Sequence, residues 1–229
     1  MLATAIIPVK RFSTAKRRLL ELLDPGQRRA LVQAMLADVL AAVTVCESIE
    51  RVVVVTGERR AERMTLWQAK RVATPLEVLR DPTDTGHSDA ATLGIVRAKA
   101  LGARCVALLP GDCPLLDPGE LDAALKRMRV GRVAVVPDRH GTGTNALLLS
   151  PADAIGPAFG PESRARHAER GRRASYEAAI EPLDSLAPDI DTPEDLRHLA
   201  AILEREPALA KSTGAVLAKL GLLPRRARA

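Results

Sequence analysis

A single acidic residue, Asp112, interrupts an apolar stretch, and its type and position suit it for chemistry. Residues 105–109 are continuously apolar, as expected of a buried parallel strand, and Pro110 removes a backbone donor where that strand must end. Asp112 then lies at the carboxyl edge of a sheet, where open α/β folds bind ligands. One carboxylate there suits Mg²⁺ holding a polyphosphate. The alternative is a turn aspartate that caps the following helix.

A second acidic stretch, DIDTPEDL at 189–196, precedes a predicted helix that Thr192, Pro193 and Glu194 would open. By itself Asp191 is typical of a helix N-cap. Joined with Asp112, it becomes a second metal ligand. Two carboxylates from separate strand ends, with triphosphate oxygens and water, would complete an octahedral Mg²⁺ site.

A basic cluster follows the first predicted strand, residues 3–9. It comprises Lys10, Arg11, Lys16, Arg17 and Arg18. Cations at the carboxyl end of a strand favour phosphate binding, because Arg gives bidentate contacts and Lys a movable point charge. A solvated basic helix start is the alternative, although helix starts usually favour acidic residues.

Two glycine-containing loops could present backbone amides and hydroxyls to an anion. Residues 138–149 read DRHGTGTNALLL, in which Thr142 and Thr144 alternate with glycines, and a hairpin without a ligand is the alternative. Residues 159–167 read FGPESRARH, in which Gly160, Ser163 and Arg164 open a basic helix; here the alternative is a capped surface helix.

A third polar loop, DPTDTGHSDAATL at 81–93, leads into a helix that we expect to start at Ser88 or Asp89. Its backbone amides could receive a base or a ribose. On composition it is an ordinary loop, and we expect His87 to be a surface histidine rather than a ligand.

Strands and helices alternate along the rest of the chain. Apolar runs predict strands at 3–9, 51–56, 76–79, 105–109, 132–136 and 145–149, and helical patterns occupy 27–45, 58–69, 90–101, 118–128, 162–171 and 192–204. This alternation predicts an α/β fold of Rossmann-like, doubly wound type, with a mostly parallel sheet and helices on both faces.

The chain of 229 residues is 47% hydrophobic and 27% charged, which is ordinary globular composition. We expect a single domain over residues 1–206. Residues 207–229 are expected to form a C-terminal helical extension with a basic tail, which would pack on the domain or on a second subunit in a homodimer.

No long apolar segment or signal-peptide core is present, so we expect a cytoplasmic protein. The three cysteines form no CxxC pair and are expected to be core thiols.

The net charge of +6 favours anionic partners. Aromatic residues make up only 2% of the chain, so it offers no stacking platform for nucleic acid. We expect neither nucleic acid nor a membrane as partner, and small polyanions fit the charge better.

Several of these motifs together carry a resemblance. PVK with AKRRL, then LLPGDCPLL, GTGTNALLL, FGPESRARH and DIDTPEDL, in this order, resemble the CofC/FbiD guanylyltransferases of deazaflavin coenzyme F(420) biosynthesis, over about residues 3–203. LPGDCPLL and DIDTPEDL are shared with the wider MobA-like nucleotidyltransferases, whereas GTGTN followed by FGPxS is more specific. The resemblance implies the fold of nucleotide-diphospho-sugar transferases.

The resemblance also implies a reaction, in which a phosphorylated three-carbon acid attacks the α-phosphorus of GTP and releases pyrophosphate. Asp112 and Asp191, with Asp189, would hold Mg²⁺, and Lys10, Lys16 and Arg18 would lie over the triphosphate. Thr144, Gly160 and Ser163 would bind the acid, with Thr142 and Arg164 beside them. Pro8, Lys10, Gly86, Asp89 and Gly111 would contact the nucleotide. The Ala- and Arg-rich composition is typical of a GC-rich bacterium, for which the resemblance implies phosphoenolpyruvate as the acid, with 2-phospho-L-lactate and 3-phospho-D-glycerate as alternatives. The product is expected to be labile, which would suit handover to the next transferase.

Two departures from the family pattern are present. Family members usually show GLNAA where this chain has GHSDAA, so Asp89 replaces an asparagine, and Glu162 stands where FGPGS is usual. A carboxylate beside an anion pocket costs affinity unless it points away or pairs with an arginine such as Arg166.

Two other functions remain as alternatives. A MobA-like transferase acting on molybdopterin would share the fold and Asp112, but its LAAGxSxRM loop is absent. A degenerate family member that only binds nucleotide is suggested by Asp89 and Glu162, but the retained Asp112 and Asp191 oppose it.

Overall fold

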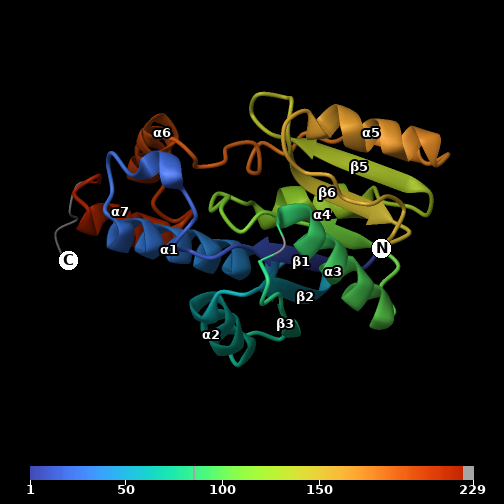
Figure 1. The fold of residues 1–229 in the computed structure, drawn as a ribbon, viewed down its shortest axis with the longest axis horizontal. Helices are drawn as coiled ribbons and strands as arrows, with labels where there is room; N and C mark the ends of the chain where they lie inside the picture. Colours follow the sequence, from blue (N-terminus) through green and yellow to red (C-terminus); the bar gives the residue numbers. More distant parts are fainter. Residues whose placement is uncertain (85, 224–229) are drawn as a thin grey trace.

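A mixed sheet forms the centre of the molecule (Figure 1). The computed structural model describes residues 1–84 and 86–223. The sheet has seven strands in the order β3-β2-β1-β4-β6-β5-β7. They are β1 (Ala3–Val9), β2 (Ile49–Thr56), β3 (Leu76–Arg80), β4 (Val106–Leu108), β5 (Arg132–Pro137), β6 (Thr144–Ser150) and β7 (Glu177–Ile180).

The direction of β6 matters for the site. β1 pairs in parallel with β2 and β4, but β6 runs antiparallel to both of its neighbours, β4 and β5. In the β4–β6 register Leu108 lies opposite Leu147, so the start of β6 at Thr144 extends beyond the carboxyl end of β4. The first residue of β6 therefore lies at the same edge of the sheet as the carboxyl ends of the parallel strands.

Helices cover both faces of the sheet. They are α1 (Pro25–Val43), α2 (Arg59–Ala69), α3 (His87–Ala100), α4 (Pro118–Lys126), α5 (Ser163–Arg173), α6 (Pro193–Arg205) and α7 (Lys211–Lys219), with a short 3₁₀ helix η1 (Arg17–Leu19). Side chains of α1, α4, α6 and α7 join one apolar core, whereas α3 contributes to a second core on the other face. Alternation along β1 divides these cores, since Ile7 joins the first and Ile6 the second.

Local sequence explains where the principal helices begin. Asp24 caps α1 by accepting from the backbone N–H groups of Gly26 and Gln27, and the Gln27 side chain returns a bond to the Asp24 backbone. Thr192 and Asp195 form the same reciprocal arrangement at the start of α6.

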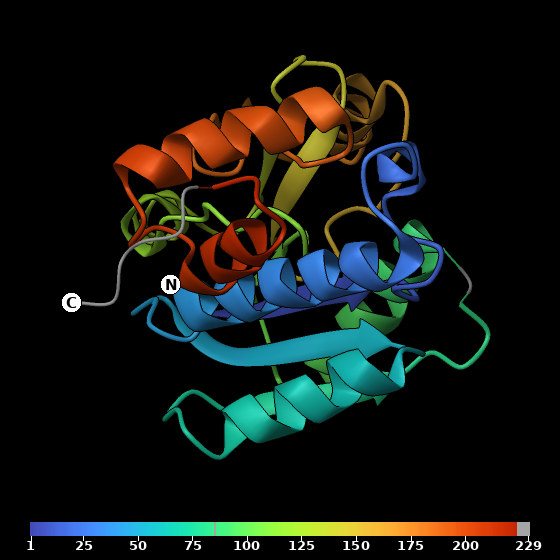
Figure 2. The same ribbon diagram turned by 90° about the vertical axis from the view of Figure 1, so that its left-hand side faces the viewer.

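The C-terminal extension packs on the domain. In Figure 2, α7 lies between α1 and α6, and Leu217 of α7 is fully buried in the first core. Asp38 of α1 accepts hydrogen bonds from the backbone N–H groups of Ser212 and Thr213, at 2.9 and 2.7 Å, and so caps α7. Of the two expected partners for this segment, the structure shows the domain itself. The predicted basic tail lies outside the described residues.

The predicted fold class is confirmed, with two differences in the sheet. The four-residue strand β7 was not predicted, because EAAI is short and neither alternating nor strongly apolar. The reversal of β6 makes the sheet mixed, since a pattern of apolar residues carries no strand direction. Cys46, Cys105 and Cys113 are buried free thiols, as expected. Within residues 1–84 and 86–223, no helix has the length and apolar character needed to cross a membrane.

Candidate active site

Two adjoining cavities lie at the sheet edge where β1 and β4 end. The first, of about 310 Å³, is lined by Pro8, Val9, Lys10, Thr14, Ala15, Lys16, Val32, Leu36, His87, Gly111, Asp112 and Asp191. The second, of about 450 Å³, is lined by Lys10, His87, Ser88, Pro110, Asp112, Thr144, Asn145, Phe159, Gly160, Asp189 and Asp191. A larger hollow of about 580 Å³ between α1 and α2 has no carboxylate in its lining, so we place the chemistry at the sheet edge.

Lys16 joins the two acidic motifs. Its Nζ donates to Asp112 Oδ2 at 2.5 Å and to Asp191 Oδ1 at 2.7 Å, although these residues lie 96 and 175 positions away in the chain. The lysine side chain is 4% exposed, while those of Asp112 and Asp191 are 36% and 48% exposed. A buried cation thus holds two carboxylates that remain accessible to a ligand.

The loop that carries Lys16 is fixed at several points. Phe12 is fully buried, and its backbone N–H donates to the Glu58 carboxylate at 3.1 Å. The Arg28 guanidinium of α1 donates to the carbonyl of Ala15 at 2.6 Å. Lys16 itself has a left-handed backbone, with φ of 54°. Non-glycine residues rarely adopt this conformation, so the surrounding contacts must maintain it.

Electrostatics favour the charged forms of Lys16 and Asp112 but not of Asp189. Burial alone would lower the pKa of Lys16, but the Asp112 and Asp191 carboxylates outweigh it and raise that pKa. Burial would raise the pKa of Asp112, but the Lys16 ammonium holds that pKa below its ordinary value. At Asp189, burial and the neighbouring negative charge of Asp191 raise the carboxyl pKa. These shifts are expected where several carboxylates share a site with one cation.

The position of the Lys16 ammonium between Asp112 and Asp191 indicates that this site can hold a cation. Both partners are hard oxygen donors, and an ammonium already occupies a position of high negative potential between them. Among the residues that the structure describes, no group of three His, Cys, Asp or Glu side chains is arranged to hold a metal. Two carboxylates fit Mg²⁺, which usually takes one or two from the protein and completes its shell with water and substrate phosphates.

Helix capping does not account for either aspartate. The N-cap of α4 is Asp117 and that of α6 is Thr192. The capping alternatives for Asp112 and Asp191 are therefore wrong, and both carboxylates are directed to Lys16 instead.

The second cavity includes part of the predicted anion-binding set. Thr144 and Gly160 line it, and Ser163 opens α5 with its Oγ buried and without a hydrogen-bond partner among the described residues. Gly160 has φ of 117°, a conformation that a side chain would strain. The hairpin that was the alternative to an anion-binding loop at residues 138–149 is present, since β5 and β6 pair antiparallel on either side of it. Thr144 of this hairpin nevertheless lines the second cavity.

The remaining predicted residues lie outside both cavities. Gly86 is the N-cap of α3, while Arg18, Asp89, Thr142 and Arg164 are exposed. Glu162 is also exposed and makes no ion pair among the described contacts. The Arg166 guanidinium donates to the carbonyls of Ala158 and Pro161, so pairing with Arg166, one of the two arrangements that would spare the anion pocket, is not found.

His87 corrects another expectation. It is half-buried at the start of α3 and lines both cavities, rather than being a surface histidine. Its ring contacts that of Phe159 edge to face, with centroids 4.6 Å apart, and burial lowers its pKa. Phe159 and Asn145 also line the second cavity without having been predicted. The only sequence signal for His87 was its position at a helix start after a polar loop.

Comparison with known proteins finds similar chains over nearly the whole length of this one. The model of a family described as "Guanylyl transferase CofC like" matches residues 3–211. A phosphoenolpyruvate guanylyltransferase of Conexibacter woesei is 42% identical over 218 residues, covering 94% of this chain and 95% of that protein. One from Streptomyces coelicolor is 35% identical over 219 residues, covering 95% of this chain and 96% of that protein.

Solved structures show the same fold at lower identity. A protein of Desulfovibrio desulfuricans G20, described as a nucleotide-diphospho-sugar transferase, aligns with a TM-score of 0.72 at 18% identity, covering 96% of this chain and 95% of that one. A nucleotidyl transferase from Methanothermobacter thermautotroptrophicus aligns with a TM-score of 0.60 at 16% identity, covering 90% of this chain and 99% of that one.

Proposed function

The chain is a nucleotidyltransferase that belongs to the CofC-like guanylyltransferase family, and from that premise we propose that it joins the guanylyl group of GTP to phosphoenolpyruvate. The observation that carries the chemistry is the group of Asp112, Asp191 and Lys16 at the sheet edge. The identity of the acid rests on the relatives that are named phosphoenolpyruvate guanylyltransferase.

The reaction is a single phosphoryl substitution. A phosphate oxygen of phosphoenolpyruvate attacks the α-phosphorus of GTP, the new P–O bond forms, and the bond to pyrophosphate breaks. The nucleophile is already ionised at neutral pH and needs no strong general base. Catalysis therefore depends on alignment of the two phosphates and on neutralisation of their charge.

Residues of the first cavity supply that neutralisation. Lys10 is exposed and lines both cavities, so its ammonium can reach the triphosphate, and Lys16 provides a second, buried cation. Asp112 and Asp191 would hold Mg²⁺, with Asp189 beside them in the second cavity. The ion would supply Lewis-acid stabilisation of the phosphate charge. Pro8 and Gly111 present backbone close to the same space.

Residues of the second cavity would bind the acid. Thr144 of β6 and Gly160 line this cavity, and Ser163 is the first residue of α5, where backbone N–H groups and the helix dipole favour an anion. Arg18, Asp89, Thr142 and Arg164 lie outside the cavities, so a role for them requires contact with parts of the ligands that extend into solvent.

The test is pyrophosphate release with Mg²⁺, in which GTP, ATP and CTP are each combined with phosphoenolpyruvate, 2-phospho-L-lactate and 3-phospho-D-glycerate. The next transferase is present to remove a labile product. We expect turnover with the combination of GTP and phosphoenolpyruvate and with none of the other combinations. Turnover with another acid would change the substrate, and no turnover in any combination would favour a binding protein without activity.

Handover of the product to that next transferase in the cytoplasm, and a homodimer, are further parts of the proposal. They are motivated by the reactivity expected of an enol diphosphate and by the family. A pull-down that fails to recover the next transferase would oppose handover, and sedimentation at several protein concentrations would test the dimer.

A further inference from the structure

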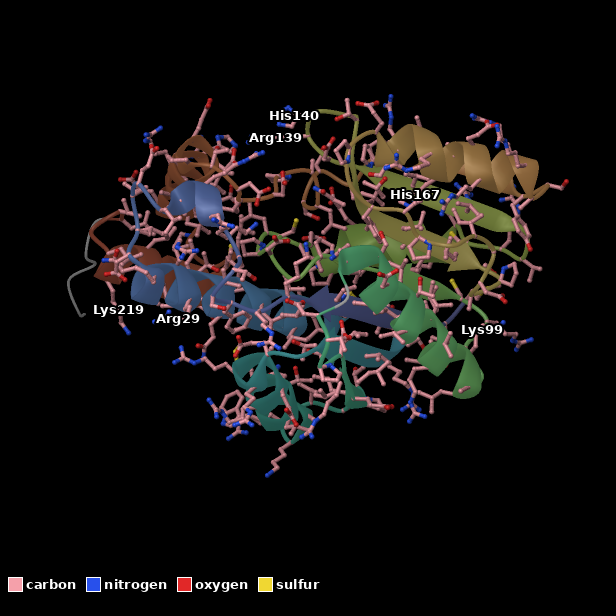
Figure 3. All side chains as sticks on the ribbon, viewed as in Figure 1. Arg29, Lys99, Arg139, His140, His167 and Lys219 are labelled. Carbon is pink, nitrogen blue, oxygen red and sulfur yellow. The ribbon has the colours of Figure 1, made fainter. Side chains whose placement is uncertain are left out.

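A histidine that no step of the proposed reaction uses lies in the interior behind the second cavity. His167 of α5 is fully buried, and Figure 3 labels it on the part of the sheet that α5 covers. Its Nδ1 lies 3.0 Å from Oγ1 of Thr144, at the start of β6. Its Nε2 lies 2.8 Å from the backbone nitrogen of Ala158.

These two contacts fix where the protons lie. A backbone N–H can only donate, so Nε2 of His167 must accept the bond from Ala158 and carries no proton. The neutral ring then has its proton on Nδ1, which donates to Thr144 Oγ1. Burial, with the positive charges of Arg170 and Arg166, lowers the pKa of His167 to about 4, so the ring is neutral near pH 7.

The direction of this chain of hydrogen bonds determines what Thr144 can offer. Its oxygen already accepts from His167, and its own hydroxyl hydrogen has no acceptor within the described part of the protein. Thr144 lines the second cavity, so that hydrogen is available to a ligand there. Ser163 is one turn before His167 on the same face of α5, and its buried Oγ also lacks a partner among the described residues.

On the basis of the proposed function, we infer that His167 is a positioning residue that fixes the Thr144 hydroxyl as a hydrogen-bond donor to the anionic acid. A free threonine hydroxyl rotates and can donate or accept. With His167 behind it, the hydroxyl is oriented before the acid binds, which favours a carboxylate or phosphate oxygen over any group that donates.

Two variants separate this role from a purely structural one. His167→Asn places an amide nitrogen near the position of Nδ1 and keeps a donor for Thr144, but Ala158 loses its acceptor. His167→Gln keeps an acceptor near the position of Nε2 but removes the donor. We expect His167→Gln to raise KM for phosphoenolpyruvate about tenfold with KM for GTP unchanged, and His167→Asn to stay within about threefold of the parent. The reverse ranking would mean that His167 only supports the Ala158 loop.

Coupling to Thr144 gives a second readout. Thr144→Val removes the hydroxyl, so His167→Gln should have no further effect on KM in that background. Additive effects of the two substitutions would overturn the inference. His198→Gln is the matched control, because His198 is exposed on α6, and it should leave both KM values unchanged.

The experiment that separates this inference from the proposed function is ¹⁵N NMR of the imidazole nitrogens, which needs no turnover. A protonated Nδ1 and a bare Nε2 on His167 at pH 7 are expected, and the opposite tautomer would overturn the inference whatever the enzyme does. If the parent shows no turnover but has this tautomer and binds phosphoenolpyruvate more weakly after Thr144→Val, only the proposed reaction fails. If Thr144→Val leaves that binding unchanged, the inference fails.

Discussion

Replacing Lys16 by methionine tests the arrangement of charges at the sheet edge. Methionine is similar in length but carries no charge, so the substitution leaves the carboxylates of Asp112 and Asp191 facing each other without the ammonium between them. A divalent cation would then bind at that position without having to displace an ammonium. The variant is expected to be less stable without metal and to gain more stability when metal is added.

The structure gives the size of the effect. Since Nζ lies 2.5 and 2.7 Å from the two carboxylate oxygens, those oxygens are at most about 5.2 Å apart, and at an effective dielectric constant of about 20 they repel by about 3 kcal/mol. Both side chains are more than one-third exposed, so water screens part of this repulsion. We expect a loss of about 1–2 kcal/mol, or about 2–8 °C in Tm.

Thermal unfolding measured first in EDTA and then along a MgCl₂ titration gives both quantities. Mg²⁺ must displace the ammonium in the parent but not in Lys16→Met, so the metal should raise the Tm of the variant more. Lys10→Met is the matched control. Lys10 lines the first cavity, as Lys16 does, but is exposed and makes no ion pair among the described contacts, so its loss should change stability by less than about 0.5 kcal/mol.

Two results would refute the reasoning. One is a Lys16→Met protein that is as stable as the parent in EDTA, because the carboxylates would then not need the cation. The other is an equal Mg²⁺-induced rise in Tm for both proteins, because the metal would then bind elsewhere.

Three further predictions concern single residues. Asp112→Asn should lower kcat about 1,000-fold, because a metal ligand is lost, with an unchanged circular dichroism spectrum; substantial turnover would contradict the metal assignment. Glu162 has φ of 56° and its side chain makes no capping bond, so Glu162→Gly should raise the free energy of unfolding by about 0.5–1 kcal/mol, and a loss in urea titration would contradict this. The pKa of His167 is about 4 when folded and ordinarily 6.5, so the unfolded chain binds more protons between these values. Its contribution to stability is complete above pH 6.5 and is lost as pH falls toward 4, by about 2 kcal/mol between pH 7.5 and 5. His167→Asn should lack this component in urea titrations at the two pH values, and an equal pH dependence of both proteins would argue against a buried neutral ring.

Local patterns predicted most of the elements and several of the chemical groups. The apolar run before Pro110 predicted β4 and the position of Asp112 at the carboxyl edge, because a buried strand and its end are properties of adjacent residues. The capping pattern at Thr192 likewise predicted the start of α6. The ordered motifs predicted the family, which the comparisons confirm. His87 and β7 were missed, because a single polar side chain and a four-residue segment carry little periodic signal.

By itself, the sequence determined most of the segments that become strands and helices and which side chains carry charge, since these follow from the periodicity and chemistry of neighbouring residues. Only the tertiary structure decided that β6 runs antiparallel, which brings Thr144 to the same edge as Asp112. It also decided that Lys16 lies between Asp112 and Asp191, 96 and 175 positions away. Such long-range placement depends on strand order, strand direction and packing of the whole sheet, which no local pattern encodes.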